Sequence, residues 1–161
     1  MRLDDETHLI LTRVGLMLIS VGVIDITVMI YCIINAMHYS SSFNVFSVTL
    51  GILLVRGNLW AASIVRFFGA LFLASGIALI TFFPFVQPIS LTLDELRNAS
   101  SFGLLFPLIL LAVCFWTTRE LNGDLVLAAF RTSGRNVTPL IYPVALGIGL
   151  VAAVGGVFIF A

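Results

Sequence analysis

Asp25 is the one charged residue that lies deep inside a long apolar stretch of this sequence. In a helix it follows Val14, where that stretch begins, by about 16 Å, which places it near the centre of a bilayer. An ionised carboxylate there costs at least ~2.5–3.5 kcal/mol, so we expect Asp25 to face protein or water, or to hold a proton. A structural hydrogen bond or ion pair and an ion or proton site both stay open. Arg66 is the candidate charged partner, and Thr49 and Ser75 are candidate neutral neighbours at similar depth.

The histidines and cysteines do not suggest a metal or haem site. His8 and His38 would lie about 45 Å apart along one helix, and a metal normally needs three or four ligands. Cys32 and Cys114 differ in expected depth by roughly 15–20 Å, well beyond the ~7 Å limit between the Cα atoms of a disulfide. We therefore predict no metal site and two buried apolar thiols.

Motifs for enzymatic chemistry are also missing. All eight basic residues are arginine, so Schiff-base chemistry and a Walker-type phosphate loop, which need a lysine amine, are excluded. The sequence has no His-Glu-x-x-His, Gly-x-Ser-x-Gly or Cys-x-x-Cys motif. Gly147-x-Gly149 lies in an apolar helix rather than after a strand, so it does not form a dinucleotide-binding turn. The sequence predicts a protein that is not an enzyme and uses no cofactor.

Composition indicates a membrane protein. Of the 161 residues, 60% are hydrophobic and 10% are charged, and the mean hydropathy is +1.15. An ordinary soluble domain has roughly a quarter charged residues, so a water-soluble globule is excluded. The eight acidic and eight basic residues cancel, which leaves no net field to attract nucleic acid. Membrane lipids are the expected surroundings.

Five apolar segments predict an all-α transmembrane bundle that forms a single domain over residues 1–161. Backbone groups in lipid must pair within a helix, and a crossing needs roughly 20 apolar residues. The expected spans are about 14–37, 40–55, 59–86, 100–118 and 137–161. The segment 40–55 would reach only about 24 Å, so the alternative is four spans plus a re-entrant or interfacial segment.

Arginine placement favours five spans, because short cytoplasmic loops collect positive residues. With an inner amino terminus and five crossings, Arg97 is the one arginine outside; the inner ones are Arg2, Arg13, Arg56, Arg66, Arg119, Arg131 and Arg135. If the segment 40–55 does not cross, at best five arginines lie on one side of the membrane and three on the other. The carboxyl terminus is then outside, and Gly57–Asn58 forms an inner hairpin in which Asn58 caps the next helix.

Two of the expected spans carry small residues at four-residue spacing. Such residues let helix backbones approach closely in lipid. The predicted helix-packing residues are Ala70, Ala74 and Ala78 in the third span and Ala145, Gly149, Ala153 and the neighbouring Gly156 in the fifth. These faces serve either packing within the chain or docking of another subunit.

The longest inner loop, between Arg119 and Pro139, is expected to contact the membrane surface. Leu121, Leu125 and Ala128 share one face of a helix, which would lie on the lipid. Arg131 and Arg135 are four residues apart and would bind an anionic lipid headgroup or a partner acid, or form a solvated basic loop.

Part of the chain resembles a group of uncharacterised bacterial inner-membrane proteins. The resemblance covers about a third of the chain and rests on the runs Ser-Ser-Ser-Phe-Asn-Val-Phe (40–46), Gly-Ile-Leu-Leu-Val-Arg-Gly (51–57), Ala-Ser-Ile-Val-Arg (62–66), Pro-Phe-Val-Gln-Pro (84–88) and Leu-Thr-Leu (91–93). It implies a multi-pass protein of the bacterial plasma membrane, with a small domain after the last span, and it carries no catalytic or binding residue.

Together these features favour a non-enzymatic membrane component that packs against copies of itself or another membrane subunit. The motivating observations are the small-residue faces and the missing catalytic motifs. The alternative is a proton- or ion-coupled channel or transporter component that uses Asp25.

Overall fold

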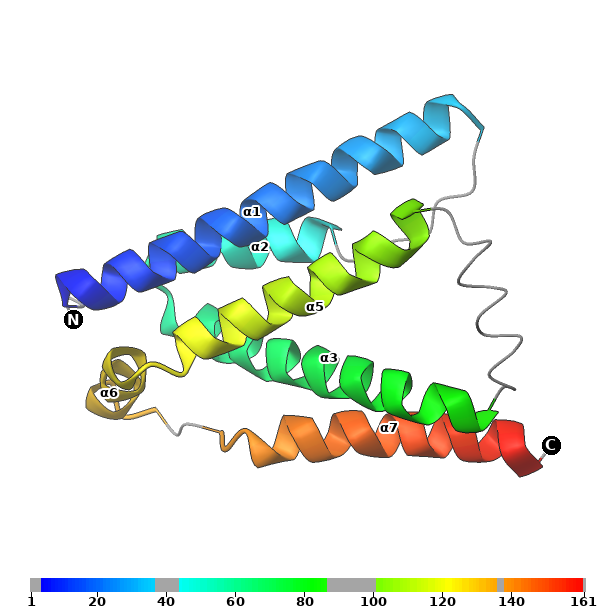
Figure 1. Cartoon of the computed structure of the whole chain (residues 1–161). Coiled ribbons are helices and arrows are strands. Elements are labelled where there is room, and N and C mark those ends of the chain that lie inside the picture. Colours follow the sequence, from blue (N-terminus) through cyan, green and yellow to red (C-terminus); the bar gives the residue numbers. More distant parts are fainter. Residues whose placement is uncertain (1–3, 37–43, 87–100, 136–137, 161) are drawn as a thin grey trace. The chain divides into compact units, whose positions relative to one another are not determined.

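A computed structural model describes residues 4–36, 44–86, 101–135 and 138–160. Over these residues the fold is all-α, with six helices and no strand, which confirms the predicted class (Figure 1). The helices are α1 (Asp5–Ile34), α2 (Asn44–Val55), α3 (Leu59–Val86), α5 (Ser101–Leu121), α6 (Asp124–Thr132) and α7 (Ile141–Phe160).

The helices follow the predicted apolar segments, but several of their ends differ from the predicted ones. α3 begins and ends where the sequence predicted, whereas α1 begins at Asp5, well before Val14. Asp5 and Glu6 lie in its first turn, where negative side chains interact favourably with the positive end of the helix dipole. α2 has 12 residues, which is about 18 Å of helix, and the serine cluster at 40–42 lies outside the described residues. α2 is therefore short for a crossing.

Two helices in the described part of the chain are long and apolar enough to cross a membrane. They are Asp5–Ile34 and Leu59–Phe82, and most residues of their apolar stretches are not buried within the protein. The core helix of a soluble protein is mostly buried, so these two helices do not fit that description. The apolar parts of α2 and α7, Val45–Val55 and Ile141–Ala153, are shorter.

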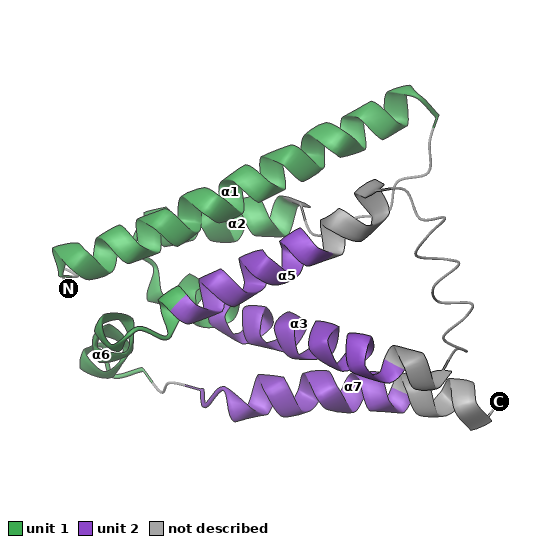
Figure 2. Cartoon of the chain, in the orientation of Figure 1, with its two compact units in different colours: residues 1–65, 120–137 green, residues 66–119, 138–161 purple. Residues whose placement is uncertain are grey.

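The chain divides into two compact units, each made of two separate stretches (Figure 2). Unit 1 comprises residues 1–65 and 120–137, with α1, α2, α6 and the beginning of α3. Unit 2 comprises residues 66–119 and 138–161, with the rest of α3, most of α5 and α7. α3 runs through both units. The prediction that residues 1–161 form a single transmembrane domain stays a prediction.

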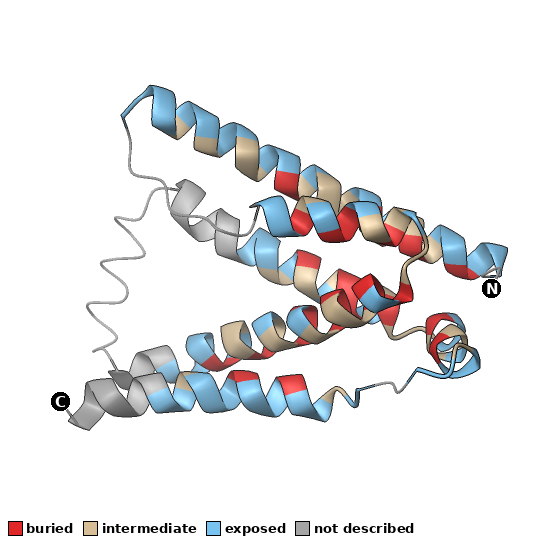
Figure 3. Ribbon diagram, turned by 180° about the vertical axis from the view of Figure 1, so that it is seen from behind, coloured by how far each residue is buried: buried red, intermediate tan, exposed pale blue. Residues whose placement is uncertain are grey.

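Unit 1 has its core where α2 and α6 pack against α1. Buried residues lie in the amino-terminal part of α1, up to Gly22 (Figure 3). α6 buries Val126 and Phe130, whereas Leu125 is 41% exposed. Val126 and Phe130 are four apart, so they share one face of α6, which packs within unit 1. Of the face that we expected to lie on lipid, Leu125 and Ala128 are exposed and Leu121 is buried; contact of this face with a membrane stays a prediction.

The corner between α2 and α3 forms as predicted. Gly57 has a φ of 73°, and its N–H donates to the Leu54 carbonyl at 2.8 Å. This left-handed glycine ends α2. The Asn58 side-chain oxygen accepts a hydrogen bond from the Trp60 N–H at 2.9 Å, which confirms the predicted cap of α3.

Candidate functional site

Asp25 lies on α1 of unit 1 and is half-buried. The last buried residue of α1 before it is Gly22, so Asp25 lies just beyond the core of unit 1. Its candidate partner Arg66 belongs to unit 2. An Asp25–Arg66 ion pair would join the two units and stays a prediction.

Arg66 is a buried charged residue in α3, with 7% of its side chain exposed. Its Nη1 donates a hydrogen bond of 3.0 Å to the Thr138 carbonyl, just before α7. A buried cation needs such partners, because an unpaired charge is costly to desolvate. The contact ties the beginning of the unit 2 part of α3 to the chain leading into α7.

The two neutral neighbours proposed for Asp25 have local roles. Thr49 is exposed, and its hydroxyl donates to the Val45 carbonyl of the same helix at 2.8 Å. Ser75 lies in unit 2 against α7: its Oγ is 2.9 Å from the position that a Cβ would take at Gly147. Thr49 and Ser75 therefore lie in different units, and their place beside Asp25 stays a prediction.

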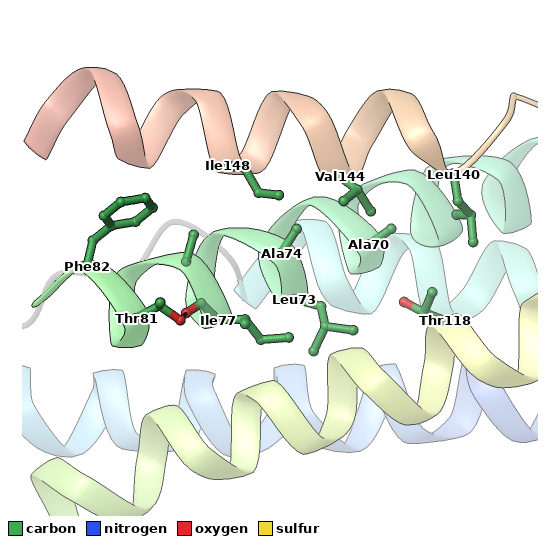
Figure 4. Close-up of a pocket in the computed structure, with 11 residues that line it drawn as sticks. Ala70, Leu73, Ala74, Ile77, Thr81, Phe82, Thr118, Leu140, Val144 and Ile148 are labelled. Carbon is green, nitrogen blue, oxygen red and sulfur yellow. Dashed lines mark hydrogen bonds between the residues drawn. The ribbon is translucent and has the colours of Figure 1, made fainter. Parts of the chain in front are cut away.

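The alanine row of α3 lines a cavity in unit 2. Ala70, Ala74 and Ala78 are buried, and they face a cavity of about 460 Å³ (Figure 4). α7 contributes the opposite wall, and α5 contributes Thr118. The residues on the α7 side are Leu140, Val144 and Ile148. Here the small residues leave space, although we expected them to mark a close helix contact.

α7 has two small-residue faces with different environments. A Cβ on Gly147 would lie 2.8 Å from the Leu71 carbonyl oxygen, so α3 and α7 touch there. A Cβ on Gly149 would meet no atom within 4 Å, and Ala145 and Ala153 are exposed as well. The predicted row is thus open along α7; Gly156 lies beyond the part of α7 whose side chains are described.

Arg131 and Arg135 both lie at the end of α6 with exposed side chains. Arg131 is in the last turn of α6, where a cation interacts favourably with the helix dipole. Gly134 has a φ of 68°, and the Arg135 N–H donates to the Phe130 carbonyl at 3.1 Å. Both arginine side chains are exposed in this turn, and their binding to a lipid headgroup stays a prediction.

The closest helix contact of unit 1 was missed from the sequence. A Cβ on Gly15 of α1 would lie 2.6 Å from the Gly51 carbonyl oxygen of α2, and one on Gly51 would lie 2.7 Å from the Gly15 carbonyl oxygen. The Ser47 hydroxyl donates to the Leu18 carbonyl across the same contact at 2.9 Å. Ser47 and Gly51 have the four-residue spacing of small residues that marks such contacts, and this signal could have identified them.

The described residues contain no group of three or more His, Cys, Asp and Glu residues that could hold a metal ion. The His8 carbonyl accepts a hydrogen bond of 2.8 Å from the Thr12 hydroxyl, and His38 lies outside the described residues. Cys32 and Cys114 are free and half-buried.

Comparisons with protein-family models, with curated proteins and with solved structures find no match to this chain.

Proposed function

We propose that this chain is a non-enzymatic, multi-pass inner-membrane protein that assembles with a second copy or with another membrane subunit. The observation that carries the proposal is the open row Ala145, Gly149 and Ala153 on α7. In lipid, where apolar surface gives no hydrophobic drive to associate, backbone approach at such small residues stabilises helix pairs. Gly149 has no atom within 4 Å of its Cβ position, so this row is available to a second helix.

Membrane location is supported by the side chains that α1 and α3 expose. Ile24 is 63% exposed and Ile34 is 77% exposed on α1, and Leu79 and Ile80 are also exposed on α3. Soluble monomers rarely expose contiguous apolar surface of more than a few hundred Å². Exposure of these apolar side chains is unfavourable in water and is not unfavourable in lipid.

A five-span topology, with the amino terminus inside and the carboxyl terminus outside, is the finer part of the proposal. A chain lacking Cys32 and Cys114 can be scanned with single cysteines at four connecting positions, Ser41, Gly57, Ser90 and Ser133. Labelling from outside is expected at Ser41 and Ser90 only. Labelling of Gly57 from outside would exclude the topology.

The assembly role is tested at Gly149. Gly149→Ile adds a branched side chain to the open row, and it should lower the dimer fraction or the amount of a co-purifying subunit without unfolding the chain. Ala112→Ile changes a different exposed position, on α5, and is the matched control. The measurement is native mass spectrometry of the full chain released from native membranes. A strictly monomeric wild-type chain with no co-purifying protein would contradict the proposal.

A further inference from the structure

α1 is longer than a membrane crossing, and its two parts differ in composition. Its 30 residues extend about 45 Å, whereas the hydrocarbon core of a bilayer is about 30 Å thick. The stretch from Val14 to Ile34 carries Asp25 as its single charge and measures about 31 Å, which matches that thickness. The residues before it, from Asp5 to Arg13, are richer in charge and would extend beyond the hydrocarbon.

Burial along α1 changes in the same direction. Thr7 is 2% exposed and Leu11 is 0% exposed, so the amino-terminal part is covered by protein. Beyond Gly22, by contrast, no described residue of α1 is buried (Figure 3). α6 packs against α1 and lies beside its amino-terminal end (Figure 1). The chain itself therefore covers the part of α1 that would project from the lipid.

α2 runs antiparallel to α1 along their contact. A Cβ on Gly51 would lie 2.7 Å from the Ile19 side chain, whereas one on Gly15 would lie 2.8 Å from the Val55 side chain. Residues later in α2 therefore lie beside residues earlier in α1. The end of α2 at Val55 is level with Gly15, close to the beginning of the apolar stretch of α1.

Two arginines and a tryptophan lie near this level of unit 1. Arg13 directly precedes the apolar stretch of α1, and Arg56 directly follows Val55 at the end of α2. Both arginine side chains are exposed, and within the described part of the chain neither forms an ion pair. Trp60 lies in the first turn of α3, just after the corner at Gly57, and is 54% exposed. Arginines beside an amphipathic aromatic ring are typical of the level of the lipid headgroups.

The opposite end of the apolar stretch carries another exposed aromatic residue. Tyr31 is 62% exposed and lies about 27 Å from Arg13 along the helix axis. This separation is close to the hydrocarbon thickness, so Arg13 and Tyr31 can reach the two interfaces at once. Asp5 and Glu6 lie about 11–12 Å from Arg13 in the other direction, which keeps these acidic groups away from anionic headgroups.

We propose that Arg13 and Arg56 bind the phosphate groups of anionic phospholipids, with Trp60 at the same interface. Lipid is favoured over an acidic protein partner because exposed apolar surface begins next to Arg13: Leu16, three residues later on the same face, is 54% exposed. The amino-terminal part of α1 and its cover, α6, then lie outside the hydrocarbon. The inference rests on the membrane location proposed above and is independent of the assembly role.

The depth of Trp60 is the first test. The full chain carrying Trp116→Phe is reconstituted in phosphatidylglycerol vesicles whose acyl chains carry bromine, which quenches tryptophan fluorescence at short range. Bromine near the headgroup should quench Trp60 about twofold more than bromine near the chain end, because the ring lies at the headgroup level. Quenching that is equal, or stronger with the deep bromine, would overturn the inference.

Headgroup binding is the second test. The full chain in mild detergent is offered equal amounts of phosphatidylglycerol and phosphatidylcholine with identical acyl chains, and native mass spectrometry measures the lipids retained. One arginine near an anionic surface contributes about fivefold, so Arg13→Gln and Arg56→Gln should each lower the preference for phosphatidylglycerol about fivefold. Arg13→Lys keeps the charge and is the matched control, which should keep most of the preference. Both positions are exposed, and Trp60 fluorescence checks that the variants fold.

The remaining outcomes separate the two proposals. An unchanged lipid preference in the double variant Arg13→Gln/Arg56→Gln would overturn the headgroup site. If that variant also lost a co-purifying protein, an acidic protein partner would be the ligand of the arginines. Equal retention of both lipids by a wild-type chain that resists alkaline extraction from membranes removes the headgroup site alone. A chain extracted by alkali removes the membrane location, and both proposals with it.

Discussion

The α1–α2 contact of unit 1 and the α3–α7 pair of unit 2 use small residues to different ends. In unit 1, Gly15 and Gly51 face each other so closely that a Cβ on either would lie within 2.7 Å of the other's carbonyl oxygen. In unit 2, the alanine row of α3 and the facing side chains of the α7 segment line a cavity of about 460 Å³. α1 and α2 touch where two glycines face each other, whereas α3 and α7 touch at Gly147 and leave a cavity along the alanine row.

The facing residues explain this difference. Two glycines let two backbones meet, and the hydrogen bond from Ser47 to the Leu18 carbonyl adds a polar contact to the pair. Along the alanine row, each position carries a methyl group and meets a branched side chain such as Val144 or Ile148. Four-residue spacing of small residues therefore marks a candidate face, and the opposite helix decides whether it becomes a contact or a cavity.

Each unit contains one tryptophan, Trp60 in unit 1 and Trp116 in unit 2. Replacing either one by phenylalanine leaves a fluorescence reporter of a single unit. Denaturation of such chains in increasing dodecyl sulfate then measures the free energy of unfolding of each unit. Substitutions in the α1–α2 contact and in the α3–α7 pair can thus be compared.

Gly51→Ala should have the largest effect. Its Cβ would meet the Gly15 carbonyl oxygen and the Ile19 side chain, each at 2.7 Å, and a backbone atom cannot move aside. We expect unit 1 to lose about 1–3 kcal/mol, the usual cost of overpacking, as measured by Trp60 fluorescence. Gly149→Ala, with nothing near its Cβ, is the control and should leave Trp60 fluorescence unchanged. Equal behaviour of the two variants would refute the glycine contact.

Gly147→Ala applies the same test to unit 2. The new methyl group would lie 2.8 Å from the Leu71 carbonyl oxygen and 3.1 Å from the Ser75 nitrogen. A loss of about 1–2 kcal/mol is expected, seen by Trp116 and not by Trp60. The loss should be smaller than for Gly51→Ala, because the cavity beside this contact lets α7 shift. A larger loss would show that the two helices are fixed as rigidly as α1 and α2.

Ser47→Ala removes the hydroxyl that joins α2 to α1. Hydrogen bonds between membrane helices contribute about 0.6 kcal/mol on average, so a loss of this size is expected from Trp60 fluorescence. Thr49→Ala removes a hydroxyl that binds within its own helix and should be close to neutral. If Thr49→Ala lowered the free energy of unfolding more than Ser47→Ala, the exposed side of α2 that carries Thr49 would contact a partner.

Gly76→Ala should have the smallest effect. The atoms nearest its Cβ position belong to the end of the Leu111 side chain, which can change rotamer. Alanine also favours a helix over glycine by roughly 0.5–1 kcal/mol, which offsets the rearrangement. Trp116 should report a change within about 0.5 kcal/mol. A loss as large as that of Gly147→Ala would show that Leu111 is held as firmly as backbone.

Local patterns made several parts of the fold predictable. The apolar run from Leu59 to Val86 corresponds to α3 at both ends, and the corner at Gly57 with its Asn58 cap forms as expected. These features depend on residues that are neighbours in sequence. α6 was predictable only in part: the sequence indicated its exposed Leu125, but the burial of Val126 and Phe130 depends on the helices that α6 packs against in unit 1.

By itself the sequence determined the all-α class, the apolar character of the helices and the lack of known catalytic motifs, because these follow from composition and from spacing along one helix. The tertiary structure alone decided that Gly15 meets Gly51, that Arg66 binds the Thr138 carbonyl, and that the alanines of α3 line a cavity. Each of these depends on the side chains of a second helix. Spacing along one helix sets which residues share a face, and the shape of the facing surface sets what that face contacts.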